Sequence, residues 1–104
     1  MKFEWDEPKR KGNIRKHGFD FIDAEKAFES DILTMPDDRE DYGEKRFVSI
    51  GLLNSTVVVI SHTERHDAIR IISMRKATKN EEAHYFEQVG NKLETDPDND
   101  GQKD

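Results

Sequence analysis

The chain has 104 residues, of which 38% are charged and 33% hydrophobic, and its formal net charge is −6. This length supports one folded domain with a modest core and excludes a second one. The sequence contains no cysteine, no cationic leader and no apolar run long enough to cross a bilayer. We therefore expect a cytoplasmic protein without disulfides that does not contact a membrane.

The negative charge is unevenly distributed along the chain. Residues 29–44 carry a net charge of −6 and residues 91–104 one of −3, so the remainder, at +3, is cationic and contains all four histidines. Phosphate binding requires a cationic surface. The uneven distribution leaves such a surface available, so the overall charge does not exclude nucleic acid as a partner.

The first third of the chain predicts an edge strand and two short helices. Residues 2–5 alternate enough for a strand, and Asp6, followed closely by a proline, is typical of a helix N-cap. A basic helix follows and ends at Gly18, which can adopt the left-handed cap conformation. Asp20 is then placed to cap a second helix that has one apolar face.

The rest of the chain predicts an antiparallel sheet and a last helix. An exposed acidic loop at residues 37–44 interrupts the β-rich stretches. A capping box, Thr78-Lys-Asn-Glu81, starts a helix that we expect to end near residue 89. The β-rich stretches fall at residues 32–35, 46–53, 56–63 and 68–75, with an Asn-Ser hairpin turn between the second and the third.

These elements predict an α+β domain over residues 1–90. Its sheet is expected to be small and antiparallel, with three to four strands plus the N-terminal edge strand, two N-terminal helices and one C-terminal helix. Residues 91–104 are polar and acidic, so they cannot bury enough apolar surface to fold and are expected to form a flexible tail.

Four short motifs follow one another between residues 3 and 87. They are F-E-W-D at residues 3–6, N-x-x-K-H-G at 13–18, T-E-R at 63–65 and R-I-I-S-x-R-K-A-T at 70–78, with Glu81 and Tyr85 beyond them. Their order and combination resemble the BrnT family of toxins from type II toxin-antitoxin systems. The sequence departs from the family pattern at Met74, where a small residue is usual, and at His66, where glycine is common.

The resemblance implies a RelE-like fold and an endoribonuclease that halts translation and arrests growth. It also implies an RNA substrate and a BrnA-like ribbon-helix-helix antitoxin that neutralises the toxin. Operator DNA is then bound only through the toxin-antitoxin complex. At Met74, a bulkier side chain at the end of the strand is expected to narrow the site.

A ribonuclease that works without a metal must activate the ribose 2′-hydroxyl, stabilise the phosphorane and protonate the leaving 5′-oxygen. Arginine suits the second task because its planar fork binds phosphate oxygens. We expect Arg65 and Arg75 to be catalytic and Arg70 to bind RNA, gathered by the last two strands and their turn. However, Arg70 and Arg75 lie five positions apart, so a regular strand would point them to opposite faces, and one then serves structure.

Histidine is the expected proton carrier because its ordinary pKa of roughly 6.5 lies near neutrality. His62 is a candidate because it lies close to Arg65 at a strand end, and His17 because it lies in the N-x-x-K-H-G motif. Glu64 would orient one of them or act as the base. The sequence leaves the choice open.

Additional RNA contacts are expected from the basic helix, the end of the last strand and the last helix. Each candidate also has a structural explanation, such as a solvated helix face, a helix cap, a core side chain or an ion pair across a turn. The expected RNA-binding residues are Lys16, Arg15, Lys76 and Tyr85, the last by stacking on a base or hydrogen-bonding to it.

Two alternatives to a metal-free enzyme were weighed. His62, Glu64 and His66 have the spacing of one strand face, but a turn intervenes and no further ligand lies nearby, so we expect no metal and no cofactor. The chain is alternatively a non-catalytic interaction or co-repressor module, whose polarised charge binds a partner. Arrest that survives alanine at Arg65 and Arg75, while repression disappears, would favour the module.

Overall fold

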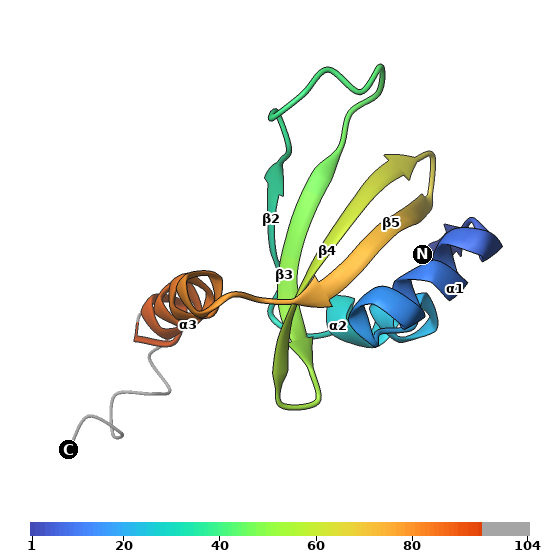
Figure 1. Ribbon diagram of the computed structural model, residues 1–104. Helices are drawn as coiled ribbons and strands as arrows, with labels where there is room; N and C mark the ends of the chain where they lie inside the picture. The colour runs from blue at the N-terminus through green and yellow to red at the C-terminus, as the bar shows by residue number, and fades with distance from the viewer. Residues whose placement is uncertain (95–104) are drawn as a thin grey trace.

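A five-stranded sheet with helices on both faces forms the domain, as Figure 1 shows for a computed structural model that describes residues 1–94. Strands follow the order β1-β5-β4-β3-β2 across the sheet. The elements are β1 (Lys2–Trp5), α1 (Glu7–His17), the 3₁₀ turn η1 (Phe21–Asp23), α2 (Ala24–Phe28), β2 (Leu33–Pro36), β3 (Phe47–Leu53), β4 (Thr56–Arg65), β5 (Ala68–Lys76) and α3 (Lys79–Glu94).

The predicted α+β class is confirmed, but the sheet is mixed rather than antiparallel. β1 pairs in parallel with β5, from Lys2 opposite Ala68 to Trp5 opposite Ile71. No hairpin turn joins these strands, so local sequence does not set their relative direction. Helix α3 continues to Glu94, past the predicted end near residue 89. Most of the predicted tail, from residue 95 onward, lies outside the described residues.

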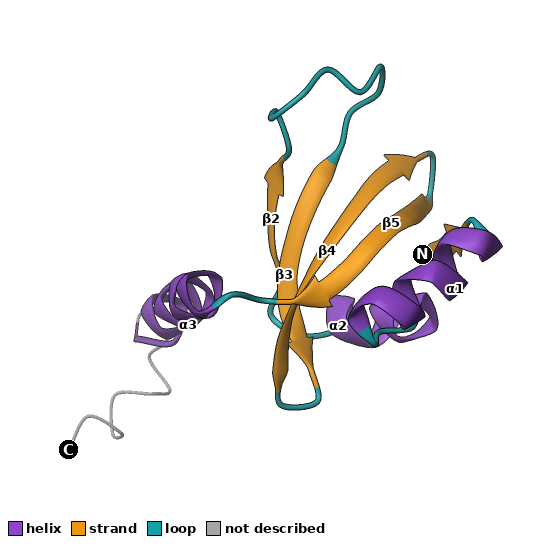
Figure 2. Cartoon of the chain, in the orientation of Figure 1, coloured by secondary structure: helices purple, strands orange, loops and turns teal. Residues whose placement is uncertain are grey.

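Side chains that alternate along β4 build a core on each face of the sheet. Val58 and Ile60 join the cluster that includes η1 and α2, whereas Val57 and Val59 join the cluster that contains Tyr85 of α3. Burying one such aliphatic side chain contributes about 1.5–3 kcal/mol. Figure 2 shows the resulting arrangement, with α1 and α2 together on one side of the sheet and α3 on the other.

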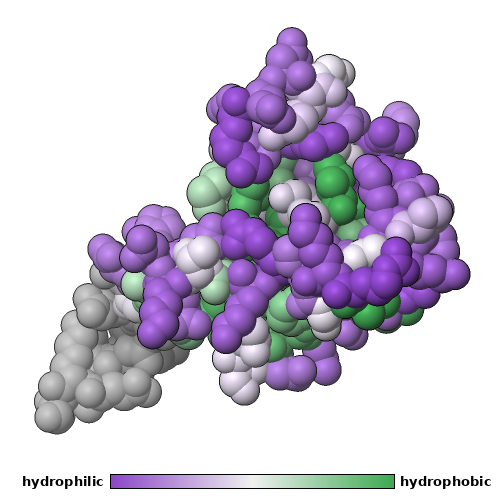
Figure 3. All heavy atoms as spheres, in the orientation of Figure 1, coloured by the Kyte–Doolittle hydropathy of each residue, from purple (hydrophilic) through white to green (hydrophobic). Residues whose placement is uncertain are grey.

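Hydrophilic side chains cover most of the visible surface, and hydrophobic atoms show between them over the sheet (Figure 3). Within residues 1–94, no helix is long and apolar enough to cross a membrane.

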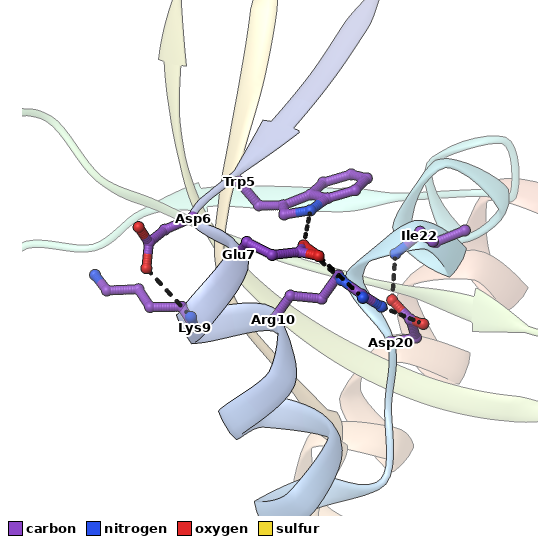
Figure 4. Close-up of polar contacts among 7 residues, drawn as sticks. All are labelled: Trp5, Asp6, Glu7, Lys9, Arg10, Asp20 and Ile22. Carbon is purple, nitrogen blue, oxygen red and sulfur yellow. Dashed lines mark hydrogen bonds and ion pairs between the residues drawn. The ribbon is translucent and has the colours of Figure 1, made fainter.

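Capping residues fix both ends of α1 as the sequence predicts. The Asp6 carboxylate accepts a hydrogen bond from the backbone N–H of Lys9 at 3.2 Å, and Gly18 closes the helix in the left-handed region at φ +78°. Asp20 caps η1 by accepting from the N–H of Ile22 at 3.0 Å, so α2 begins only after this extra turn. Figure 4 shows both carboxylates in these contacts.

Arg10 ties α1 to the segment that follows it. Its guanidinium contacts Glu7 at 2.7 Å and Asp20 at 2.9 Å, and Glu7 also accepts from the indole of Trp5 at 3.2 Å (Figure 4). These contacts lower the pKa of Glu7, chiefly through the hydrogen bond from Arg10. Strand β1, helix α1 and η1 are thereby joined through one cation.

Candidate functional site

A cleft of about 480 Å³ opens on the sheet face that faces away from α2. Three segments border it: the loop after β2, the C-terminal end of α1 and the N-terminal turn of α3. The strands form the floor of the cleft, which carries apolar side chains and two serine hydroxyl groups. The floor residues are Met35, Val48, Val59, Ser61 and Ser73, and the charged and imidazole groups around them are Lys16, His17, Asp37, Asp38, Arg39, Arg75 and Glu81.

Arg75 is held at the cleft by a bidentate pair with Glu81 of α3. Nη1 lies 2.8 Å from Oε1 and Nη2 lies 2.9 Å from Oε2. Glu81 also accepts from the N–H of Thr78, whose hydroxyl accepts from the N–H of Glu81, which confirms the predicted capping box. The hydrogen bonds from Arg75 lower the pKa of Glu81 to about 2, and the same contact raises the pKa of Arg75.

Asn13 places the end of α1 beside the cleft. Its side-chain amide donates to the carbonyls of Met74 at 2.8 Å and Phe19 at 2.9 Å, and its carbonyl accepts from the N–H of Met74 at 3.1 Å. One turn later, Lys16 and His17 line the cleft. The N-x-x-K-H-G motif therefore joins the buried Asn13 to two residues that line the cleft.

A β-bulge in β5 puts Arg70 and Arg75 on the same face of the sheet. Ile71 and Met74 both belong to the core beneath the sheet, although a regular strand would point them to opposite faces. The register with β4 shifts between the partners of Ser61 and His62, which accounts for the change. The expectation of opposite faces is wrong for this reason. Arg70 nevertheless lies outside the cleft lining and binds Glu4 of β1 at 3.0 Å.

Arg65 does not join Arg75. Arg75 pairs with Val59 across the sheet, six residues before Arg65 on β4, which corresponds to about 20 Å along a strand. Arg65 is exposed at the far end of β4 and binds Glu44 of the acidic loop at 3.3 Å. Glu64 is exposed at the same end. The expected clamp of three converging arginines is therefore not present.

His62 lies in the core rather than in the cleft. It is fully buried on the face that carries α2, where its ring lies 5.2 Å from that of Phe28 and 5.8 Å from that of Phe47. Nε2 is 2.7 Å from the hydroxyl of Ser49. Burial lowers the pKa of His62, so the ring is neutral near pH 7. These surroundings are those of a core side chain, which is the structural explanation for this histidine.

Tyr85 is also a core residue. Its ring is fully buried in the core on the α3 face of the sheet, and its hydroxyl donates to the carbonyl of Asp31 at 2.6 Å. The ring cannot stack on a base in this position. Arg15 and Lys76 are exposed on the surface but do not line the cleft.

The two departures from the family pattern do not obstruct the cleft. Met74 is fully buried in the core on the opposite face, so it does not narrow the site as expected. His66 adopts φ +53° in the turn between β4 and β5, a conformation that glycine adopts more readily.

Three of the predicted site residues line the cleft, namely Lys16, His17 and Arg75. Sequence reasoning missed Arg39 and the two serines, and it treated Glu81 only as a cap. The ion pair of Glu81 with Arg75 could have been predicted, because a capping-box carboxylate six residues after an arginine at a strand end can reach that arginine. For the serines, strand alternation places Ser61 on the face of Val59 and Ser73 on the face of Arg75, but it does not indicate that this face lines a cleft.

The fold and the cleft define a small α+β protein whose cleft is lined by guanidinium, ammonium, imidazole and carboxylate groups. A family model described as the ribonuclease toxin, BrnT, of type II toxin-antitoxin systems matches residues 5–81. The chain therefore belongs to the BrnT family of ribonuclease toxins, which implies RNA as substrate and an antitoxin as partner. A search of curated proteins gave no match.

Proposed function

We propose that this protein cleaves RNA in the cleft by transesterification without a metal ion, and thereby inhibits translation. The observation that carries the proposal is the position of Arg75, whose guanidinium is held by Glu81 on the lining of a cleft that also contains His17 and Lys16. A preorganised cation at a reacting phosphate stabilises the transition state without having to reorganise.

In the proposed reaction the ribose 2′-oxygen forms a bond to phosphorus while the bond to the 5′-oxygen breaks. The products are a 2′,3′-cyclic phosphate and a 5′-hydroxyl. Arg75 stabilises the phosphorane charge, and Lys16 adds a second positive charge. Ser61 and Ser73 supply hydroxyl donors to the phosphate from the floor.

His17 is the imidazole of the cleft, and it is assigned to take the proton from the 2′-hydroxyl and to return a proton to the 5′-oxygen. It replaces His62 in this role because His62 is buried on the other face. Arg65, Arg70 and Glu64 are assigned to ion pairs or the exposed rim of the sheet, and Tyr85 to the core. Arg15 and Lys76, which are exposed, are assigned to RNA phosphates beyond the cleft.

The proposed antitoxin is a BrnA-like ribbon-helix-helix protein, and its complex with this chain is proposed to bind operator DNA. The four motifs that resemble BrnT toxins support this assignment. Co-expression with such an antitoxin should restore growth, and only the complex should retard an operator fragment in a gel.

The experiment that tests the activity uses purified protein and a defined RNA oligonucleotide, with and without EDTA and with and without ribosomes. The expected products carry 2′,3′-cyclic phosphate and 5′-hydroxyl ends, and EDTA leaves the rate unchanged. Cleavage that EDTA abolishes would refute the metal-free mechanism. Intact RNA under all these conditions, together with operator repression, would favour the co-repressor module.

A further inference from the structure

The loop after β2 presents a second arginine to the cleft. Arg39 donates to the Asp37 carboxylate through Nε at 2.8 Å, Nη2 at 2.9 Å and its backbone N–H at 3.3 Å. The Asp37 side chain is only 3% exposed, whereas that of Arg39 is 72% exposed. A buried carboxylate therefore fixes a guanidinium that faces solvent at the cleft.

The loop is built around this pair. Asp37 also accepts from the hydroxyl of Tyr42 at 3.4 Å, and its backbone N–H donates to the carbonyl of Arg46 at 2.8 Å, which closes the base of the loop. The hydrogen bonds from Arg39 lower the pKa of Asp37. A buried carboxylate requires a paired cation, so Asp37 fixes the position of Arg39, and the exposed part of this guanidinium is held in place at the cleft.

Arg39 and Arg75 both line the cleft although they carry like charges. The positive charge of Arg39 lowers the pKa of Arg75, which opposes the larger effect of Glu81. Asp37 holds Nε and Nη2 of Arg39, and Glu81 holds Nη1 and Nη2 of Arg75. Both side chains remain partly exposed at the cleft, and an anion between the two guanidinium groups would relieve their repulsion.

We infer that Arg39 is a second phosphate-binding residue, which holds an RNA phosphate adjacent to the one that Arg75 engages. The inference rests on the proposed function, and it names the substrate feature that this side of the cleft contacts. A volume of about 480 Å³ exceeds what one phosphate group fills and lies in the range of sites for whole small ligands. Arg39 therefore binds substrate rather than performing the chemical step.

The test compares Arg39→Gln with Lys45→Gln. Lys45 is an exposed cation of the same loop that does not line this cleft, so the control removes the same formal charge. Arg39→Gln should raise KM for an RNA oligonucleotide about tenfold and leave kcat within about twofold, because the lost contact is equally strong in the bound substrate and in the transition state. Lys45→Gln should change KM by less than about twofold.

The salt dependence of the affinity for RNA provides a second measurement. This dependence would not change if Arg39 had only a structural role. Loss of one phosphate contact should reduce the slope of log affinity against log salt by about 0.7 for single-stranded RNA. Arg39→Lys keeps the positive charge but loses the planar guanidinium group, so it should have a higher affinity and a steeper salt slope than Arg39→Gln. Thermal unfolding of each variant identifies any loss of fold.

Binding to an oligonucleotide with a 2′-deoxy group at the scissile position separates this inference from the proposed function. If the wild-type protein cleaves RNA and Arg39→Gln matches Lys45→Gln in KM and salt slope, the inference is overturned and the proposed function stands. If the wild-type protein does not cleave, the proposed function fails. The Kd values of the two variants for the deoxy oligonucleotide then still decide whether Arg39 binds a phosphate.

Discussion

Replacing Asn13 by alanine should destabilise the domain and also impair the site. The Asn13 side chain, which is 7% exposed, occupies the edge of β5 that β1 leaves unpaired, since β1 reaches only to Ile71. There its amide pairs with both backbone groups of Met74 as a neighbouring strand would. A third hydrogen bond, to Phe19, holds the chain just after α1.

The expected loss follows from the groups left unpaired. The Asn13→Ala substitution removes the partners of one N–H and two carbonyls, and each buried orphan costs about 1–3 kcal/mol. The hydrogen bond to Phe19 is only partly buried, so we take the lower end for each group and expect a loss of about 3 kcal/mol in the free energy of unfolding. Because Lys16 and His17 follow one turn later, kcat for RNA cleavage should fall as well.

Urea unfolding followed by circular dichroism measures this loss. Asn80→Ala is the matched control, because Asn80 is exposed on α3 and should change stability by less than about 0.5 kcal/mol. Asn13→Asp should be no better than alanine at neutral pH, since a carboxylate cannot donate to two carbonyls. A free energy of unfolding for Asn13→Ala within the range of the control would refute the reasoning.

Three further predictions concern stability. Glu81 has a pKa lowered from 4.5 to about 2, so its contribution to the free energy of unfolding is present above pH 4.5 and is lost as the pH falls toward 2. In urea titrations, Glu81→Gln should therefore be less stable than the wild type at pH 7 and should match it near pH 2. Burial lowers the pKa of His62 below 6.5, so stability should decline on acidification below that value, and the decline should be smaller in His62→Phe. A Cβ at Gly51 would lie 2.9 Å from the carbonyl of Ala27, so Gly51→Ala should cost about 1–3 kcal/mol in thermal unfolding. At Gly12 on α1 the nearest atom is 3.8 Å away, and alanine should stabilise by up to about 1 kcal/mol, so equal effects at the two glycines would contradict the packing described.

Local signals in the sequence predict the element boundaries well. The Asp6 cap, the glycine cap at Gly18 and the Thr78–Glu81 box all act between residues a few positions apart, and the structure contains each of them. The hairpin at Asn54 is likewise local, and this residue adopts φ +59°. Such features can be predicted from the sequence because the residues that form them lie close together in the chain.

The residues that form the cleft were harder to predict from the sequence, because the cleft depends on contacts between residues that lie far apart in the chain. The bulge in β5 puts Arg70 and Arg75 on the same face, and no residue in the strand predicts a bulge. The cationic pattern of the last two strands favoured Arg65, which lies at the end of β4 away from the cleft. The composition of the acidic loop does not indicate its role, since the pairing of Arg39 with Asp37 depends on the folded conformation of the loop.

The central claim is that the cleft beside α3, and not the turn between β4 and β5, holds the scissile phosphate. Its most direct test is the kcat/KM for one RNA oligonucleotide, measured for Arg75→Gln and Arg65→Gln after both are shown to be folded. The structure predicts a loss of at least about 100-fold for Arg75→Gln, because a preorganised charge at the reacting group is removed. Arg65→Gln, which breaks an exposed ion pair, should stay within about threefold of the wild type. A large loss at Arg65 together with near wild-type activity at Arg75 would contradict the claim.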